Sequence, residues 1–157
     1  MDDGTLSPTA DALTQLILSM FRATNLAVTW GDRVVAPLGL TSARWQILGA
    51  IIEAERPQPV AWLARDLGAN RQNVQRIIND LEKDGLVEFQ PNPHHKRAQL
   101  VVLTEKGQRT YDAAVRSYNP HANAIADGFS LEDIKAAYRI MLALRQKLGN
   151  EVAEQDG

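Results

Sequence analysis

Apolar side chains recur every three to four positions along much of this chain, a spacing typical of amphipathic helices that pack on a core. The first such run predicts a helix over residues 9–35, which ends where Pro37 and Gly39 interrupt the pattern. This helix is longer than a small domain usually needs, and long helices at chain ends often serve as arms for a partner subunit. The polar residues 1–8 before it are expected to form a frayed tail.

The middle of the chain predicts three shorter helices, over residues 42–54, 60–67 and 71–84. Their ends are marked by capping and chain-breaking residues, namely Thr41, Pro57, Pro59, Gly68, Asn70 and Gly85. The third helix is strongly one-sided, because its apolar residues cluster within about 100° of arc. Those apolar residues are Val74, Ile77, Ile78 and Leu81.

The periodicity then changes from helical to two-residue alternation, which indicates β-strands. Residues 86–89 and 99–103 are short apolar runs, and the polar segment 91–97 between them has turn chemistry. Together these segments predict a β-hairpin with a basic tip. The order of helix, short helix, glycine-containing turn, polar helix and hairpin predicts a winged helix-turn-helix in a mainly α-helical chain.

A helical pattern resumes after the hairpin, where Thr104 is the expected cap and Pro120 the expected interruption. Gly107 in the first turn is expected to be a local weak point of this helix. A last helix is predicted to begin after Ser130, with Asp133 completing a capping box. The polar residues 150–157 beyond it are expected to be disordered.

The third predicted helix and the hairpin tip carry side chains suited to reading DNA. Arginine pairs bidentately with guanine, asparagine and glutamine pair with adenine, and a reading helix presents its N-terminal residues to the major groove. A basic hairpin tip can enter the adjacent minor groove or contact phosphate. The candidate DNA-contacting residues are Asn70, Arg71, Gln72, Asn73, Gln75, Arg76, Lys96 and Arg97. The alternative is a solvated helix face and an ordinary exposed turn, although solvated faces usually include Asp and Glu throughout.

The overall charge at first opposes this interpretation, since 17 Lys and Arg against 19 Asp and Glu give a net charge of −2. Residues 60–103, however, hold six basic and five acidic side chains, so the predicted reading head is the positive part of an acidic chain. We therefore expect modest non-specific affinity for DNA, with base and groove contacts supplying more of the discrimination.

Composition and motifs argue against several other classes of protein. The chain has no cysteine, and its three histidines, His94, His95 and His121, are too few for an obvious metal site, so we expect neither metal nor cofactor. Phosphate-binding glycine loops and hydrolase motifs are missing, so we do not expect an enzyme. No apolar stretch approaches the ~20 residues of a membrane span, and the N-terminus is acidic, which predicts a cytoplasmic protein without a membrane partner.

Two tryptophans lie where the first and second predicted helices meet. Trp30 and Trp45 could line an apolar pocket, with Arg44 or Arg33 holding the carboxylate of a small ligand, since ligand pockets are mostly apolar with a few polar groups. Plain packing in the core explains the same two indoles without any ligand, and both interpretations stay open at the level of sequence.

The stretch from Leu40 to Gly107 resembles the MarR family of multiple-antibiotic-resistance regulators. Several segments carry the resemblance in this order and at this spacing, namely residues 40–48, 63–68, 70–74, 81–88, 92–98 and 103–107. The terminal helices match the family in position and amphipathic character. The resemblance implies a homodimer, a recognition helix in the major groove, Arg97 of the wing in the minor groove, and small aromatic or phenolic ligands between the arms and the head.

The resemblance also divides the chain. It implies a single MarR-like unit over residues 1–157, with a winged helix-turn-helix DNA-binding region over residues 40–103. The dimerisation helices are then residues 9–36 and 104–149. One departure lies in the wing, where His95 stands at the position of an Asp that would orient Arg97 by a charge-assisted hydrogen bond. Other positions that are usually basic in the family are Asp80, Asp84, Phe89 and Gln90 here.

From these observations we expect a dimeric, sequence-specific DNA-binding transcription regulator that recognises a pseudo-palindromic operator in double-stranded DNA. The resemblance favours a repressor that a small aromatic or phenolic ligand releases. The thin positive charge favours an alternative from another class, a winged helix that serves as a protein-interaction module without sequence-specific DNA binding.

Overall fold

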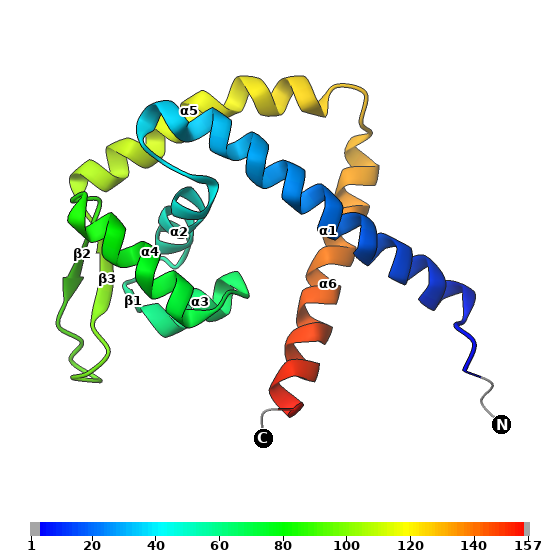
Figure 1. Ribbon diagram of the computed structural model, residues 1–157, viewed down its shortest axis with the longest axis horizontal. Coiled ribbons are helices and arrows are strands. Elements are labelled where there is room, and N and C mark those ends of the chain that lie inside the picture. Colours follow the sequence, from blue (N-terminus) through cyan, green and yellow to red (C-terminus); the bar gives the residue numbers. More distant parts are fainter. Residues whose placement is uncertain (1–3, 156–157) are drawn as a thin grey trace.

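The computed structural model describes residues 4–155 and has the predicted architecture, a mainly helical chain with a small antiparallel sheet (Figure 1). The helices are α1 (Pro8–Val35), α2 (Ser42–Glu53), α3 (Val60–Leu67), α4 (Arg71–Lys83), α5 (Glu105–Ala126) and α6 (Leu131–Gln155), and a 3₁₀ turn, η1 (Ala36–Leu38), follows α1. The strands are β1 (Gln58–Pro59), β2 (Val87–Gln90) and β3 (Leu100–Leu103). Helices α2, α3 and α4 form a winged helix-turn-helix head with the sheet, and we call α1, α5 and α6 the arms.

Polar caps begin the helices of the head at the positions predicted from the sequence. The Thr41 hydroxyl accepts a hydrogen bond from the Arg44 backbone N–H at 3.2 Å, and the Asn70 side chain accepts one from the Asn73 N–H at 3.1 Å. Gly68 ends α3 with a φ of 62°, a left-handed conformation that glycine adopts without steric cost. The end of α3 at Gly68 and the capped start of α4 at Asn70 make the turn between the two helices tight. This turn fixes the start of α4 relative to the rest of the head.

Both ends of the chain are more helical than predicted. The Ser7 hydroxyl accepts a hydrogen bond from the Ala10 N–H at 3.1 Å and caps α1, and Pro8 occupies the first turn, where its missing N–H costs nothing. Residues 1–3 of the predicted tail lie outside the described residues. At the other end, α6 continues to Gln155, although residues 150–157 were expected to be disordered, and residues 156–157 lie outside the described residues. That expectation rested on polarity alone, whereas Glu, Ala and Gln in this segment are good helix formers.

The core lies in the head, where α2, α3, α4 and the sheet turn their apolar faces toward one another. Its largest fully buried side chains are Val35, Leu48, Leu63, Val74, Ile78, Leu81, Val87 and Val101. Burial of each such side chain is worth about 1.5–3 kcal/mol relative to exposure. Val35 is the last residue of α1, so this arm is anchored in the head by its final turn.

The sheet has three strands in the order β1-β3-β2, rather than the two of the predicted hairpin. Strands β2 and β3 pair antiparallel with Val87 opposite Leu103, and β1 adds to the other side of β3 with Gln58 opposite Val101. Sequence reasoning missed β1 because it is two residues long and contains Pro59. An edge strand tolerates proline, since one side of it needs no donor for a neighbouring strand.

Helix α5 runs through Pro120, so the predicted interruption near this residue was wrong. A proline inside a helix removes one hydrogen bond and crowds the carbonyl four residues earlier, at a typical cost of about 3 kcal/mol. Pro120 and Arg116, whose carbonyl loses its donor, are both exposed. Water can therefore replace the lost donor, and the helix continues.

Gly107 lies where the first turn of α5 crosses the chain just before β2. A Cβ atom added at Gly107 would lie 2.0 Å from the carbonyl oxygen of Leu86 and 3.0 Å from Leu103 Cδ1. Thr104 holds this crossing, since its hydroxyl donates to the Gly85 carbonyl at 2.6 Å and accepts from the Gly107 N–H at 3.0 Å. The close approach therefore requires glycine at this position despite its low helix propensity.

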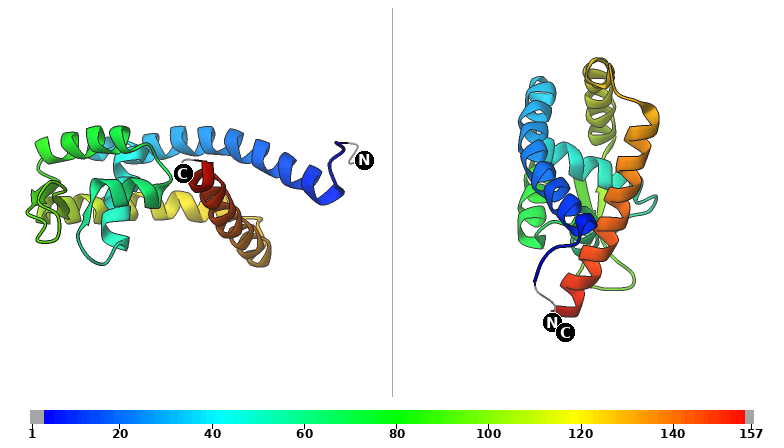
Figure 2. Two further views of the ribbon diagram at one scale, coloured as in Figure 1. Left: turned by 90° about the horizontal axis from the view of Figure 1, so that it is seen from below. Right: turned by 90° about the vertical axis from the view of Figure 1, so that its right-hand side faces the viewer.

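The N-terminal part of α1 extends away from the head (Figure 2), and the arms leave much of their apolar surface uncovered. Helix α1 packs on α2 and α5, whereas α6 makes little contact with other elements of its own chain within the described residues. The exposed large apolar residues of the arms and of the segment between α5 and α6 include Leu13, Leu18, Phe21, Leu26, Ile125, Phe129, Leu131, Ile134, Tyr138, Ile140, Leu142, Leu148 and Val152. An apolar surface of this extent marks an interaction site.

No single helix within residues 4–155 has both the length and the apolar character needed to cross a membrane. One bent pair, α1 with η1 followed by α2 at an angle of 82°, meets the limits of length and composition only. In the same residues, no group of three or more His, Asp or Glu side chains is placed to hold a metal ion.

Candidate nucleic-acid interface

Helix α4 presents one buried face and one exposed polar face. Its stripe of Val74, Ile77, Ile78 and Leu81 is buried, as the periodicity predicted. The opposite side exposes Arg71, Gln72, Asn73, Arg76 and Asn79, while Gln75 is half-buried. No acidic side chain stands in the first nine residues of α4, so its N-terminal turns offer amides and guanidinium groups alone.

Hydrogen bonds within α4 hold several of these side chains in fixed orientations. Asn73 is bonded through its backbone N–H to the Asn70 cap, and its side-chain oxygen accepts from Arg76 Nη2 at 2.8 Å. Gln75 Nε2 donates to Asn79 Oδ1 at 2.9 Å. Side chains restrained in this way lose less rotamer freedom when they meet a partner.

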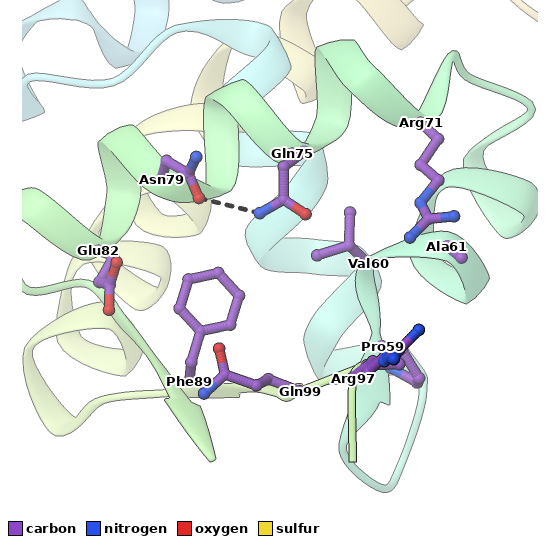
Figure 3. A pocket seen from close by; sticks show the side chains of 11 residues that line it. Pro59, Val60, Ala61, Arg71, Gln75, Asn79, Glu82, Phe89, Arg97 and Gln99 are labelled. Carbon is purple, nitrogen blue, oxygen red and sulfur yellow. Dashed lines mark hydrogen bonds between the residues drawn. The ribbon is translucent and has the colours of Figure 1, made fainter. Parts of the chain in front are cut away.

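A groove separates α4 from the wing, and we call it the α4–wing groove (Figure 3). Its volume is about 420 Å³, and it is lined by Pro59, Val60 and Ala61 of β1 and α3, by Arg71, Gln75, Asn79 and Glu82 of α4, and by Phe89, Arg97, Ala98 and Gln99 of the wing. Figure 3 shows Gln75 bonded to Asn79 on the α4 side, facing the ring of Phe89. The structure thus brings Arg71, Gln75 and Arg97 of the predicted set to one surface.

The wing tip is organised by Asn92. Its side chain donates to the Ala98 carbonyl at 2.9 Å and accepts from the His94 N–H at 3.0 Å, which closes the loop between β2 and β3. Lys96 and Arg97 are exposed at this tip and form no ion pair within the described residues. Two exposed cations are thereby held on a closed loop beside α4.

The acidic residues at the end of α4 differ in their surroundings, because Glu82 lines the α4–wing groove whereas Asp80 and Asp84 lie close to cations. Asp84 forms an ion pair with Arg44, which also donates to the Gly39 carbonyl at 3.0 Å. Asp80 lies 4.0 Å from Lys83 on the same helix. Asp84 is therefore partly neutralised by the head itself, and its negative charge counts less against an anionic partner than the sequence alone suggested.

The two tryptophans at the junction of arm and head meet on a tyrosine. Tyr118 of α5 lies 5.4 Å from Trp30 and 5.2 Å from Trp45 between ring centroids, both in edge-to-face geometry. A cavity of about 210 Å³ adjoins them, and we call it the arm cavity. Neither Arg44 nor Arg33 lines it, because Arg44 is directed to Asp84.

Sequence reasoning missed three residues that shape these sites. Asn79 bonds Gln75, Asn92 closes the wing, and Tyr118 joins the two indoles. The Asn-Pro pair at residues 92–93 is a turn signal that could have identified Asn92. Tyr118 had no such signal, since only the fold brings α5 beside α1 and α2.

Comparison with known proteins places this geometry in a family. A model described as the MarR family matches residues 38–98. The uncharacterised protein Rv2011c of Mycobacterium tuberculosis is 35% identical over 140 residues, which are 87% of this chain and 96% of the relative. The transcriptional activatory protein BadR of Rhodopseudomonas palustris is 29% identical over 139 residues, which are 83% of this chain and 76% of the relative.

Solved structures agree with this assignment. Sco5413, a MarR family transcriptional regulator from Streptomyces coelicolor, has a TM-score of 0.74 and 25% identity, with 88% of this chain and 96% of that one covered. The regulator MosR of M. tuberculosis, solved in complex with DNA, has a TM-score of 0.70 and 22% identity, covering 84% and 94%. CouR from Rhodococcus jostii, solved with p-coumaroyl-CoA, has a TM-score of 0.74 and 18% identity, covering 83% and 91%. The chain belongs to the MarR family of transcription regulators.

Proposed function

We propose that the protein is a sequence-specific regulator that inserts α4 into the major groove of double-stranded DNA and its wing into the adjacent minor groove. The observation that carries the proposal is the polar face of α4, where Arg71 and Arg76 lie exposed among amides and beside the wing cations Lys96 and Arg97. Arginine and amide side chains at the start of a helix are the groups that read base edges. The complex of the structural relative MosR with DNA supports the same class of partner.

A second copy of the chain is the partner we propose for the arms. The exposed apolar residues of α1 and α6 lie on helices that carry little of the chain's own core, and a two-fold interface would bury them. Two reading helices related by this symmetry would meet half-sites about 34–36 Å apart on a pseudo-palindromic operator. A charged arm with no apolar stripe would have argued for a monomer.

Base reading and phosphate contact make different predictions for two arginines. Arg76→Ala is expected to cost about 1–3 kcal/mol on the preferred operator and to relax the preference at one base position. Arg97→Ala is expected to weaken binding evenly across sequences and to make the salt slope shallower by about one. Fluorescence anisotropy against an operator and its single-base variants, at several salt concentrations, measures both effects.

The control for these two variants is Arg109→Ala on α5, which removes the same charge from a residue that does not line the α4–wing groove. Arg76 and Arg97 are exposed, so neither substitution should change the free energy of unfolding by more than about 0.5 kcal/mol. If Arg76→Ala and Arg97→Ala both bind like Arg109→Ala, the assigned contacts are wrong.

We further propose repression that a small aromatic ligand relieves by binding in the arm cavity. Its volume of about 210 Å³ suits a single aromatic ring, since a cavity of about 150 Å³ can hold benzene. CouR is a structural relative that binds an aromatic acyl thioester, whereas the relative BadR is an activatory protein. A promoter–reporter assay tests whether the protein represses or activates transcription. Repression requires lower reporter output when the protein is present and recovery of that output when the ligand is added.

A thermal-shift panel of monocyclic aromatic carboxylates tests this ligand. A ligand at 100 times its Kd should stabilise the protein by about 2.7 kcal/mol, which is roughly 5–11 °C in Tm for a chain of this size. Ala27→Leu, which fills the cavity from an exposed position, should abolish the shift. A flat response of the parent protein would leave Trp30 and Trp45 as core packing only.

A further inference from the structure

We propose that Arg44 and Asp84 are positioning residues that hold the reading helix α4 at the angle that DNA binding requires. This role rests on the proposed function, and it belongs to residues that need not touch DNA. Arg44 Nη1 donates to the Gly39 carbonyl at 3.0 Å, and Arg44 Nη2 donates to the Asp84 carboxylate. Gly39 ends η1, the turn between α1 and α2, whereas Asp84 ends α4. One guanidinium therefore joins the base of the arm α1 to the far end of the reading helix.

The Arg44 side chain is more firmly held than a surface cation. It is 18% exposed, and its Nε is buried without an acceptor in the part of the chain that the structure describes. A buried donor without an acceptor is costly, so this orientation indicates that the other two bonds of the guanidinium outweigh the loss. A planar guanidinium serves two acceptors in fixed directions, unlike the flexible point charge of a lysine. The two bonds of Arg44 thus fix Gly39 and Asp84 relative to each other.

A second cation restrains the same end of α4 from the arm α5. Lys106, in the first turn of α5, donates from Nζ to the backbone carbonyl of Asp84 at 2.7 Å. Carbonyls at the end of a helix lack partners within the helix, and positive groups there also oppose the negative end of the helix dipole. Asp84 is therefore held through its carboxylate by Arg44 and through its backbone by Lys106. These bonds lead to the bases of two arms.

These contacts restrain the reading helix at both of its ends. The turn at Gly68 and the Asn70 cap hold its start, and the bonds of Asp84 hold its end. Helix α4 has 13 residues, so a tilt of about 10° about its start would move its middle, where Arg76 lies, by about 1.7 Å. Hydrogen bonds tolerate far less, because their donor–acceptor distances span only about 2.7–3.2 Å. Loss of the restraint at Asp84 should therefore impair base reading more than phosphate contact.

Charge and position predict opposite results when Asp84 is replaced. Removal of a carboxylate from a DNA-binding head should by charge alone strengthen binding to every duplex. We expect Asp84→Ala instead to weaken binding to the preferred operator about tenfold, as loss of a charge-assisted hydrogen bond predicts, while binding to a random duplex stays equal or strengthens. Asp84→Glu keeps the carboxylate and should restore operator binding. Asp84 is exposed, so these variants should fold.

The matched control is Asp80→Ala, which removes the same charge from the same helix. The Asp80 carboxylate lies 4.0 Å from Lys83 of α4 itself, so its loss leaves the bonds between α4 and the arms intact. Operator binding by Asp80→Ala should stay equal to that of the parent or become stronger. If Asp84→Ala and Asp80→Ala bind the operator alike, the proposal is overturned.

A measurement without DNA separates this proposal from the proposed function. Burial should protect the Arg44 Nε–H from solvent and give a slowly exchanging side-chain signal in nitrogen-15 spectra, assigned with Arg44→Lys. We expect this signal to persist in Asp80→Ala and to be lost by exchange in Asp84→Ala, and its persistence in Asp84→Ala would overturn the proposal. A parent protein that prefers no duplex, but loses the signal in Asp84→Ala, refutes the proposed function and leaves the bond between the arm and α4 standing.

Discussion

Tyr138→Glu is expected to convert the protein from a dimer to a monomer and to abolish high-affinity binding to a palindromic operator. Tyr138 of α6 is 64% exposed in the isolated chain and lies one turn from Ile134 and Leu142, so all three share one face. A two-fold interface would bury two introduced carboxylates without partners, at several kcal/mol for each ion. Even a total of only about 4 kcal/mol would weaken the dimer roughly a thousandfold.

Sedimentation velocity measures the oligomeric state, and anisotropy with an operator duplex measures the loss of affinity. The control is Lys147→Glu, which lies nine residues or two and a half turns further along α6 and so points to the opposite side. The Lys147→Glu substitution adds the same carboxylate and changes the net charge by more than Tyr138→Glu does, yet the Lys147→Glu protein should remain dimeric. A Tyr138→Glu protein that sediments as a dimer and binds the operator like the parent would show that α6 does not form the interface.

Gly107→Ala is expected to destabilise the protein by about 3 kcal/mol, near the upper end for forcing an extra methyl group into a packed site. The new Cβ would lie 2.0 Å from the Leu86 carbonyl oxygen, which belongs to the backbone and cannot rotate away. The same oxygen accepts the hydrogen bond of the Thr104 N–H at 3.1 Å. Any shift that relieves the clash therefore disturbs the junction between α5 and the sheet.

Thermal unfolding should show this loss as a decrease in Tm of roughly 6–12 °C for a chain of this size. Gly49→Ala is the matched control, because it makes the same change inside another helix, where the new methyl group would lie 3.5 Å from Tyr111, an ordinary contact. Helix propensity predicts a gain of up to about 1 kcal/mol there. Equal Tm values for the two variants would mean that the crossing at Gly107 is not close-packed.

The helices of the head could be predicted from the sequence because local rules decide their ends. Asn70 and Gly85 bracket α4, and the period of Val74, Ile77, Ile78 and Leu81 sets the face that is buried. The role of Gly107 could not be predicted in this way, since it depends on a carbonyl twenty-one residues earlier that only the fold brings near. Local propensity describes a residue within its own helix and says nothing about such a crossing.

The candidate site likewise contains residues that could be predicted from the sequence and residues that could not. Residue types alone were enough to select the α4 and wing side chains, because base reading demands particular donors and acceptors. The roles of Arg44 and Asp84 depend on a contact between residues forty positions apart, and this contact removes Arg44 from the arm cavity.

Sequence-specific recognition of DNA by α4 and the wing can be tested by selection from a random duplex library. The selection should be run with the full chain at low and at physiological salt, because phosphate contacts alone weaken steeply with salt. We predict enrichment of a pseudo-palindrome with half-sites one helical turn apart, retained at physiological salt and changed at one base position by Arg76→Ala. Absence of any enriched palindrome at both salt concentrations would contradict the account and favour a winged helix that binds another protein.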